Sequence, residues 1–105
     1  MNSALAAALD GAGVLAETQG DYDRAESSHR QALALSRNLD DQEGIARALN
    51  NLGVVAFDRG DLDRSEALIT AGLALARETG APDLIATALN DLGRLAYHRR
   101  DFPRA

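Results

Sequence analysis

The sequence predicts an all-α fold of stacked antiparallel helix pairs, a solenoid, and three observations lead to that class. The segment Ala48–Ala67, ALNNLGVVAFDRGDLDRSEA, returns in altered form as Ala8–Ala25 and as Ala88–Ala105, at a spacing of 40 residues. Internal repeats with a period of roughly 20 to 50 residues are typical of stacked supersecondary units. The apolar residues are mostly Ala and Leu, and only 4% of the chain is aromatic, which favours packed helices over strands. We therefore expect no sheet.

The 105 residues are enough for one domain with a small core. We divide this domain into repeats of about residues 1–40, 41–80 and 81–105, the last of them truncated. The chain then holds about two and a half repeats. Within each repeat we name the first helix A and the second helix B.

The first repeat contains a predicted A helix over about residues 3–19, where apolar residues recur at steps of three and four. Gly20 tolerates positive φ at the end of this helix, and the carboxylate of Asp21 can cap the next one. The first B helix is predicted over about residues 22–37, with His29 as the unusual residue on its apolar stripe. It ends in a segment rich in Asn and Asp, where Asp40 or Asp41 can cap the helix that follows.

The second repeat follows the same plan, with an A helix over about residues 42–59, a Gly60-Asp61 turn and a B helix over about residues 62–79. Gly80 then ends the B helix, and Pro82 opens a third A helix that runs to about Arg99. Residues 101–105 repeat residues 21–25, so a third B helix is predicted to begin there.

A glycine recurs at one position in the middle of every A helix, as Gly13, Gly53 and Gly93. Glycine in a helix interior costs about 1 kcal/mol relative to Ala. We therefore predict that the B helix of each repeat lies close against the A-helix backbone at this position. The third A helix has no complete B helix after it, so its apolar face should be uncovered; the residues expected there are Ile85, Leu89, Leu92 and Ala96. Such a face predicts either a fragment of a longer arm or self-association through this end.

The composition excludes several classes of function. The net charge of -5 and the pI near 4.8 give no basic surface for nucleic acid. The chain has no Cys, so it can form neither disulfides nor thiolate metal sites. The apolar start lacks a basic segment and is interrupted by Asp10 and Glu17, which argues against a signal peptide or a membrane span. We expect a cytoplasmic protein, and the Ala-, Gly- and Arg-rich composition without Lys suggests a bacterial genome rich in GC.

No catalytic or metal-binding constellation is evident. His29 and His98 are the two histidines, and they lie on different helix types and in distant repeats. Residues 11–16, GAGVLA, match a dinucleotide-binding pattern, but they lie inside a predicted helix and not at a strand-to-helix turn. We therefore predict no enzymatic activity, no cofactor and no metal. For His29 we predict a half-buried spacer with a hydrogen bond, because Ile69 takes its place in the next repeat.

The repeat unit resembles the tetratricopeptide repeat, in which a large apolar residue, Leu-Gly, a turn and a small residue recur. In the second repeat these are Leu49, Leu52-Gly53, Gly60-Asp61 and Ser65. The unit is longer than the 34 residues of the family standard, and in this respect it is similar to the arms of bacterial LuxR-type and antibiotic-regulatory regulators. The resemblance implies a right-handed superhelix of helix pairs whose A helices line a concave face that binds peptides, proteins or small ligands.

The resemblance places a candidate binding stripe on the concave side of the A helices, and the helical spacing independently puts these residues opposite the apolar stripe. Asn50, Asn90 and Arg94 would offer donors to a peptide backbone or a carboxylate. The flanking positions are Asp10, Val14, Glu17, Thr18 and Thr87. The candidate residues themselves are Arg47, Asn50, Asn51, Val54, Phe57, Asp58, Asn90, Asp91, Arg94, Tyr97 and His98.

Two functions follow from this surface. The first is a protein–protein interaction scaffold that binds a peptide or protein partner on its concave face. The alternative is a ligand-sensing or assembly arm of a bacterial transcriptional regulator or signalling ATPase. A third possibility is that the stripe is only a solvated helix face.

Overall fold

The computed structural model describes residues 3–100, which form five α-helices without a strand among them. The helices are α1 Ser3–Thr18, α2 Tyr22–Asn38, α3 Gln42–Asp58, α4 Leu62–Thr79 and α5 Pro82–Arg100. The prediction of an all-α chain of A and B helices is therefore confirmed, with α1, α3 and α5 as A helices and α2 and α4 as B helices. The predicted start of a third B helix at residues 101–105 lies outside the described residues.

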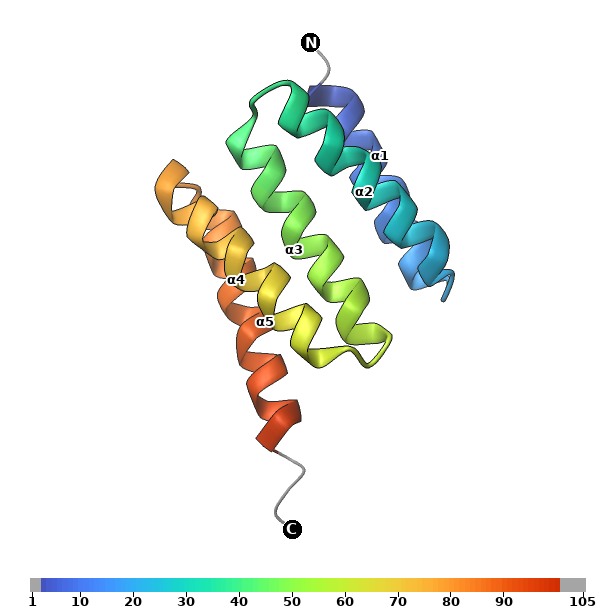
Figure 1. Cartoon of the computed structure of the whole chain (residues 1–105), viewed down its shortest axis with the longest axis vertical. Coiled ribbons are helices and arrows are strands. Elements are labelled where there is room, and N and C mark those ends of the chain that lie inside the picture. The colour runs from blue at the N-terminus through green and yellow to red at the C-terminus, as the bar shows by residue number, and fades with distance from the viewer. Residues whose placement is uncertain (1–2, 101–105) are drawn as a thin grey trace.

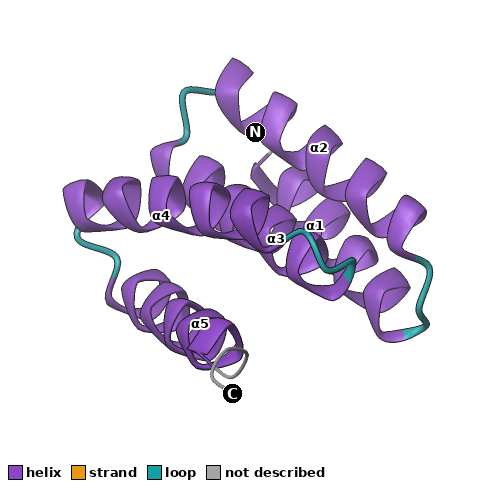
Figure 2. Ribbon diagram, turned by 60° about the horizontal axis from the view of Figure 1, so that its bottom comes forward, coloured by secondary structure: helices purple, strands orange, loops and turns teal. Residues whose placement is uncertain are grey.

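The helices follow one another in antiparallel pairs, as Figure 1 shows for α1 with α2 and for α3 with α4. Helix α3 lies at the centre and contacts each of the other four helices. Helix α5 lies at one end of the stack, where it packs mainly against α4 (Figure 2). The molecule is thus a row of helix pairs, and α3 is covered by α2 on one side and by α4 on the other.

The turns between helices share one geometry, and Gly20 shows how it works. This residue has φ of 78°, which glycine adopts without steric cost. The amide of the following Asp21 donates to the carbonyl of Ala16 over 2.9 Å and closes the end of α1. The Asp21 carboxylate then accepts from the Arg24 amide over 3.2 Å and caps α2.

The second turn differs from the others at one residue. Asp40, with φ of 56°, occupies the left-handed position that Gly20, Gly60 and Gly80 hold in the other turns. The cap that follows is Asp41, whose carboxylate accepts from the Gly44 amide over 3.1 Å. Of the two residues predicted as possible caps, Asp40 and Asp41, it is therefore Asp41 that caps α3.

In the first two repeats the B helix lies close against the A helix at the glycine in the middle of the A helix. A Cβ on Gly13 would lie 2.6 Å from the His29 ring of α2, and one on Gly53 would overlap Ile69 of α4. These two contacts confirm the prediction. At Gly93 no atom among the described residues lies within 4 Å of that Cβ position. The third B helix, which would approach this glycine, is predicted to begin outside the described residues, so for Gly93 the close approach stays a prediction.

Fewer apolar residues of α5 are uncovered than the four that were predicted. Ile85 and Leu92 are half-buried and pack against the cluster of Ile69, Leu73 and Ala88, so they belong to the core. Leu89 is 46% exposed, and Ala96 is exposed as well. Within residues 3–100, no helix combines the length and the apolar character that crossing a membrane requires.

Candidate functional site

An open groove of about 520 Å³ runs along α5 where this helix meets α3. The A helices supply all of its lining, and five of the residues predicted for the binding stripe belong to it. Tyr97 is exposed there, with 69% of its surface accessible. The lining residues are Phe57 of α3 and Leu89, Asn90, Gly93, Arg94, Tyr97 and His98 of α5.

The wall of the groove nearest α3 is held together by an aromatic and cationic stack. The Arg94 guanidinium lies 5.4 Å from the centre of the Phe57 ring, and the His98 ring meets the same phenyl group edge-on at 5.1 Å. A cation over an aromatic face is attracted by the ring quadrupole. Arg94 also donates from Nη1 to Oδ1 of Asp91 over 3.1 Å. These contacts fix the Arg94 head, while its side chain stays 54% exposed.

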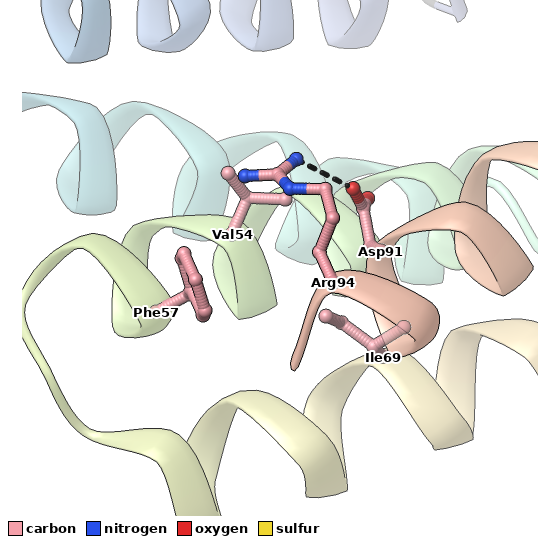
Figure 3. Close-up of a pocket in the computed structure, with 5 residues that line it drawn as sticks. All are labelled: Val54, Phe57, Ile69, Asp91 and Arg94. Carbon is pink, nitrogen blue, oxygen red and sulfur yellow. Dashed lines mark hydrogen bonds and ion pairs between the residues drawn. The ribbon is translucent and has the colours of Figure 1, made fainter. Parts of the chain in front are cut away.

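Beneath this stack lies a small cavity between α3, α4 and α5, which Figure 3 shows with Asp91 bonded to Arg94. Its volume is about 10 Å³, which is the space of about one water molecule. The residues around it are Val54, Phe57, Ile69, Asp91 and Arg94. The interior is therefore closed to ligands at this point, and the open groove is the accessible side.

The carboxyl groups of Glu17 on α1 and Asp58 on α3 face each other where these two helices meet. Burial, a side-chain hydrogen bond with Asp58 and the negative charges of Asp58 and Asp91 raise the pKa of Glu17 from 4.5 to about 8, against an opposing effect of Arg94. Glu17 consequently binds its proton more tightly than an ordinary glutamate does. Glu17, which the sequence placed at the flank of the stripe, thus contacts the stripe directly.

Asn50 and Asp91, which the sequence placed in the binding stripe, are buried and bonded to each other. The Asn50 amide donates from Nδ2 to Oδ2 of Asp91 over 3.1 Å and joins α3 to α5. Only 6% of Asn50 and 9% of Asp91 is exposed. The two side chains are buried because neighbouring A helices pack through these positions, and Oδ1 of Asn50 has no hydrogen-bond partner among the described residues.

The other residues of the predicted binding stripe lie at several places along α3. Asn51 and Val54 are half-buried on α3, and Asp58 is exposed near the end of that helix. Arg47 lies apart from them, in a separate open groove beside the start of α1. Of the flanking residues, the exposed ones are Val14, Thr18 and Thr87.

Asp10 was also expected at the flank of the stripe, and there the expectation is wrong. Its carboxylate is buried between α1 and α2, with Oδ1 2.9 Å from Nδ1 of His29. His29 is 0% exposed, so it is fully buried and not half-buried, although the predicted hydrogen bond is present. The ring lies against Gly13, where the missing side chain makes room for it.

The sequence analysis did not predict the buried pairs Asp10–His29 and Asn50–Asp91, although a pattern in the sequence indicates the first of them. Asp10 and His29 stand where the second repeat has Asn50 and Ile69. Both departures fall in the same repeat, and a buried His needs an acceptor or donor close by. The Asn50–Asp91 pair left no such signal, because both residues fit a solvated helix face equally well.

Within residues 3–100, no group of three or more His, Cys, Asp or Glu side chains could hold a metal ion. The groove combines an exposed phenol, an apolar Leu89 side chain, the amide of Asn90 and the guanidinium of Arg94.

Comparison with known families agrees with this geometry. A sequence model of the tetratricopeptide repeat family matches residues 44–105, and a second model of the tetratricopeptide repeat matches residues 8–43. No curated protein matches the chain. Tetratricopeptide repeats generally mediate contacts between proteins and are typically not enzymes. With two matches that together span residues 8–105 and a stack of A and B helices, the chain belongs to the tetratricopeptide repeat family.

Proposed function

We propose that this chain is a protein–protein interaction scaffold that binds a segment of a partner protein in the groove along α5. The observation that carries this proposal is the groove itself, which is open, lies on the A-helix side and exposes Tyr97 and Leu89. Exposed aromatic and aliphatic residues beside a fixed Arg are the residue types that dominate protein interfaces. We place this interaction in the cytoplasm and assign the chain no catalytic role, no cofactor and no nucleic-acid partner.

The shape of the site favours a protein over a small molecule. Small-molecule sites bury most of the ligand surface in a concave pocket of about 300 to 1,000 Å³. Here the small cavity measures about 10 Å³, and the space of about 520 Å³ is an open groove. A partner segment can cover such a groove along its length, whereas a metabolite would remain largely in water.

The polar groups of the groove define what the partner must present. Arg94 is held by Asp91 and Phe57, so little side-chain entropy is lost when its remaining N–H groups bind an acceptor. Asn90 is exposed one turn before it and can both donate and accept. We expect a backbone carbonyl or a carboxylate of the partner at Arg94 and an apolar side chain between Leu89 and Tyr97.

The test is selection of peptides from a random display library against the intact chain, followed by affinity measurements on two variants. Tyr97→Asp places a charge in the groove and should weaken the selected peptides at least tenfold. Ala71→Asp places the same charge on the exposed side of α4 and should leave their affinity unchanged. Equal binding to both variants, or a selection that yields no binder, would overturn the proposal.

The alternative function, a ligand-sensing arm of a bacterial regulator, predicts that a metabolite binds the folded chain. A metabolite that binds the folded chain raises its melting temperature in proportion to the logarithm of its concentration. A thermal-shift screen that found such a metabolite, with the shift abolished by Arg94→Ala, would favour the sensor over the scaffold.

A further inference from the structure

Within residues 3–100, both junctions between repeats carry an arginine at the same position. At each junction the B helix of one repeat packs against the A helix of the next, α2 against α3 and α4 against α5. Arg59 directly follows α3 and Arg99 lies in the last turn of α5, so the two residues are separated by the repeat spacing of 40 positions. Each arginine reaches back to the first turn of the preceding B helix.

At the second junction Arg99 binds two carboxylates of α4. Its Nη2 atom lies 2.7 Å from Oδ1 of Asp63 and 3.4 Å from Oε1 of Glu66. The two carboxylates are three positions apart near the start of α4, so they lie on one face of that helix. The Arg99 side chain is 37% exposed, and its Nε atom is buried without a hydrogen-bond partner among the described residues. The side chain therefore lies against the protein and does not extend into water.

The first junction has the same arrangement, which shows that it belongs to the repeat and not to one pair of helices. Nη2 of Arg59 binds Oδ1 of Asp23 and lies 3.6 Å from Oε1 of Glu26. Asp23 and Glu26 occupy in α2 the positions that Asp63 and Glu66 occupy in α4. A cation shared by two carboxylates forms a small network, which contributes more than an isolated surface ion pair does.

Helix α5 is thereby tied to the α3–α4 pair at two places. The first is the hydrogen bond between Asn50 and Asp91, and the second is Arg99, eight residues further along α5. Eight residues of α-helix span about 12 Å. A helix held at one point can pivot about that point, whereas a second contact fixes its direction.

The groove lies beside the part of α5 whose direction is fixed in this way. Its lining includes Arg94, Tyr97 and His98 of α5 and Phe57 of α3. His98 immediately precedes Arg99 and meets the Phe57 ring edge-on at 5.1 Å. A pivot of α5 about its middle would therefore change the distance across the groove.

We propose that Arg99 is a positioning residue of the groove. Through its two carboxylate partners it holds the end of α5 against α4 and so sets the distance between the α5 wall and Phe57. The consequence for binding rests on the proposed function, whereas the consequence for the position of α5 does not. Arg59 holds the preceding junction in the same way and does not line the groove, so it is the matched control.

Distances between spin labels test the position of α5. Because the chain has no Cys, exposed alanines can be replaced by Cys in pairs and labelled: Ala74 with Ala96 across the second junction, and Ala34 with Ala74 across the first. Arg99→Gln should shift or broaden the distribution of distances between positions 74 and 96 and leave that between positions 34 and 74 unchanged. Arg59→Gln should do the reverse.

Salt and helix content provide two further measurements on the same labelled chains. Sodium chloride at about 1 M, where the Debye length is about 3 Å, should give the unsubstituted chain the distances of Arg99→Gln and leave that variant unchanged. Circular dichroism should find equal helix content with and without the substitution. A loss of helix in Arg99→Gln would show that the arginine stabilises the last turn of α5 and does not direct the helix, which would overturn the inference.

Peptides selected for the groove test the consequence for binding. Arg99→Gln should weaken them about two- to fivefold, the range that the loss of a surface ion pair allows. Arg59→Gln should leave their affinity unchanged. Arg99→Lys should recover part of the loss, because an ammonium group keeps the charge but lacks the planar fork of donors.

The combined results separate this inference from the proposed function. Distances between positions 74 and 96 that stay the same in Arg99→Gln would overturn the inference, and a fall in affinity without such a change would mean that Arg99 touches the partner itself. If the distances change and the affinity does not, Arg99 positions α5 but the peptides do not bind in the groove, so the proposed function fails and the tether stands.

Discussion

Asn50 of α3 and Asp91 of α5 share a buried hydrogen bond of 3.1 Å between residues 41 positions apart in the sequence. The same carboxylate binds Arg94 on its other oxygen and so connects the interior to the groove. A buried polar group that loses its partner costs about 1–3 kcal/mol. This one carboxylate therefore contributes both to stability and to the position of the groove cation.

The first prediction concerns that carboxylate. Asp91→Ala should lower the free energy of unfolding by about 1–3 kcal/mol, because the Asn50 amide is left buried without an acceptor. Asn90→Ala, at an exposed neighbouring position, should change it by less than about 0.5 kcal/mol. Urea unfolding measures both. Equal effects of the two substitutions would show that the Asn50–Asp91 bond does not contribute to stability.

The second prediction is that replacing either of two equivalent glycines, Gly53 and Gly93, by Ala changes stability in opposite directions. Gly53→Ala should destabilise by about 1–3 kcal/mol, since the added Cβ overlaps Ile69, and Gly53→Leu should lower the melting temperature further. Gly93→Ala meets no described atom within 4 Å and should stabilise by up to about 1 kcal/mol through helix propensity. Calorimetry of the three variants checks the signs. A melt of Gly53→Leu identical to that of wild type would refute the close contact.

The third prediction is a pH dependence of stability that originates at Glu17. Its pKa is about 8 in the folded chain, against an ordinary value of 4.5, so the folded state binds more protons between these pH values. Stability is therefore greatest below about pH 4.5 for this group and is lost as the pH rises through about 8. Glu17→Gln should remove this decline, seen as the difference between wild-type and variant unfolding curves from pH 5 to pH 9.

A direct titration separates the causes of that shift. The pKa of Glu17, followed through its carboxyl resonance by NMR, should be lower in Asp58→Asn, because the like charge is removed and the Asn amide can donate to the Glu17 carboxylate. A Glu17 pKa unchanged by Asp58→Asn would exclude Asp58 as a cause.

The fourth prediction concerns the buried pair of Asp10 and His29. His29→Ile alone should destabilise by at least about 1–3 kcal/mol, because it leaves the Asp10 carboxylate buried without its partner. Combining it with Asp10→Asn recreates the residues that the second repeat has at these positions. The double variant should be more stable than the single one, which a double-mutant cycle measures. Strict additivity would show that the two residues do not act as a pair.

The fifth prediction follows from the turn at Asp40. A non-glycine residue in the left-handed region costs about 1–2 kcal/mol, although Asp tolerates it better than most. Asp40→Gly should therefore stabilise by about 0.5–1 kcal/mol, reduced by the loss of the exposed Gln42 contact. Asp41→Ala should instead destabilise by about 1 kcal/mol through loss of the cap. Thermal unfolding distinguishes the two, and destabilisation by Asp40→Gly would contradict the strain.

The sequence predicted the helices well because their signals are local. Gly20, Gly60 and Gly80 end helices through positive φ, and Asp21 and Asp61 cap the next ones, so the predicted boundaries lie within a residue or two of the observed ones. The 40-residue repeat then implied the stacking, because equivalent residues in neighbouring pairs must pack alike.

The candidate site was predicted less well because it depends on contacts between repeats. A helix face opposite the apolar stripe was taken as accessible, yet A helices meet along part of that face and bury Asn50 and Asp91. Helical spacing alone cannot separate a polar residue in water from one bonded to a neighbouring helix. Phe57, Asn90, Arg94, Tyr97 and His98 do line one groove, and their role in binding stays a proposal.

Helix α3 contacts every other helix, whereas α1 and α5 each contact only part of the stack. Among the described residues, packing contacts between the two ends of the molecule therefore run through α3, and the Glu17–Asp58 and Asn50–Asp91 contacts are the points where α1 and α5 meet it. The charges of Asp91 and Arg94 on α5 also act on Glu17 of α1. A charged partner group bound at Arg94 would thus alter the proton affinity of Glu17 even if α3 did not move.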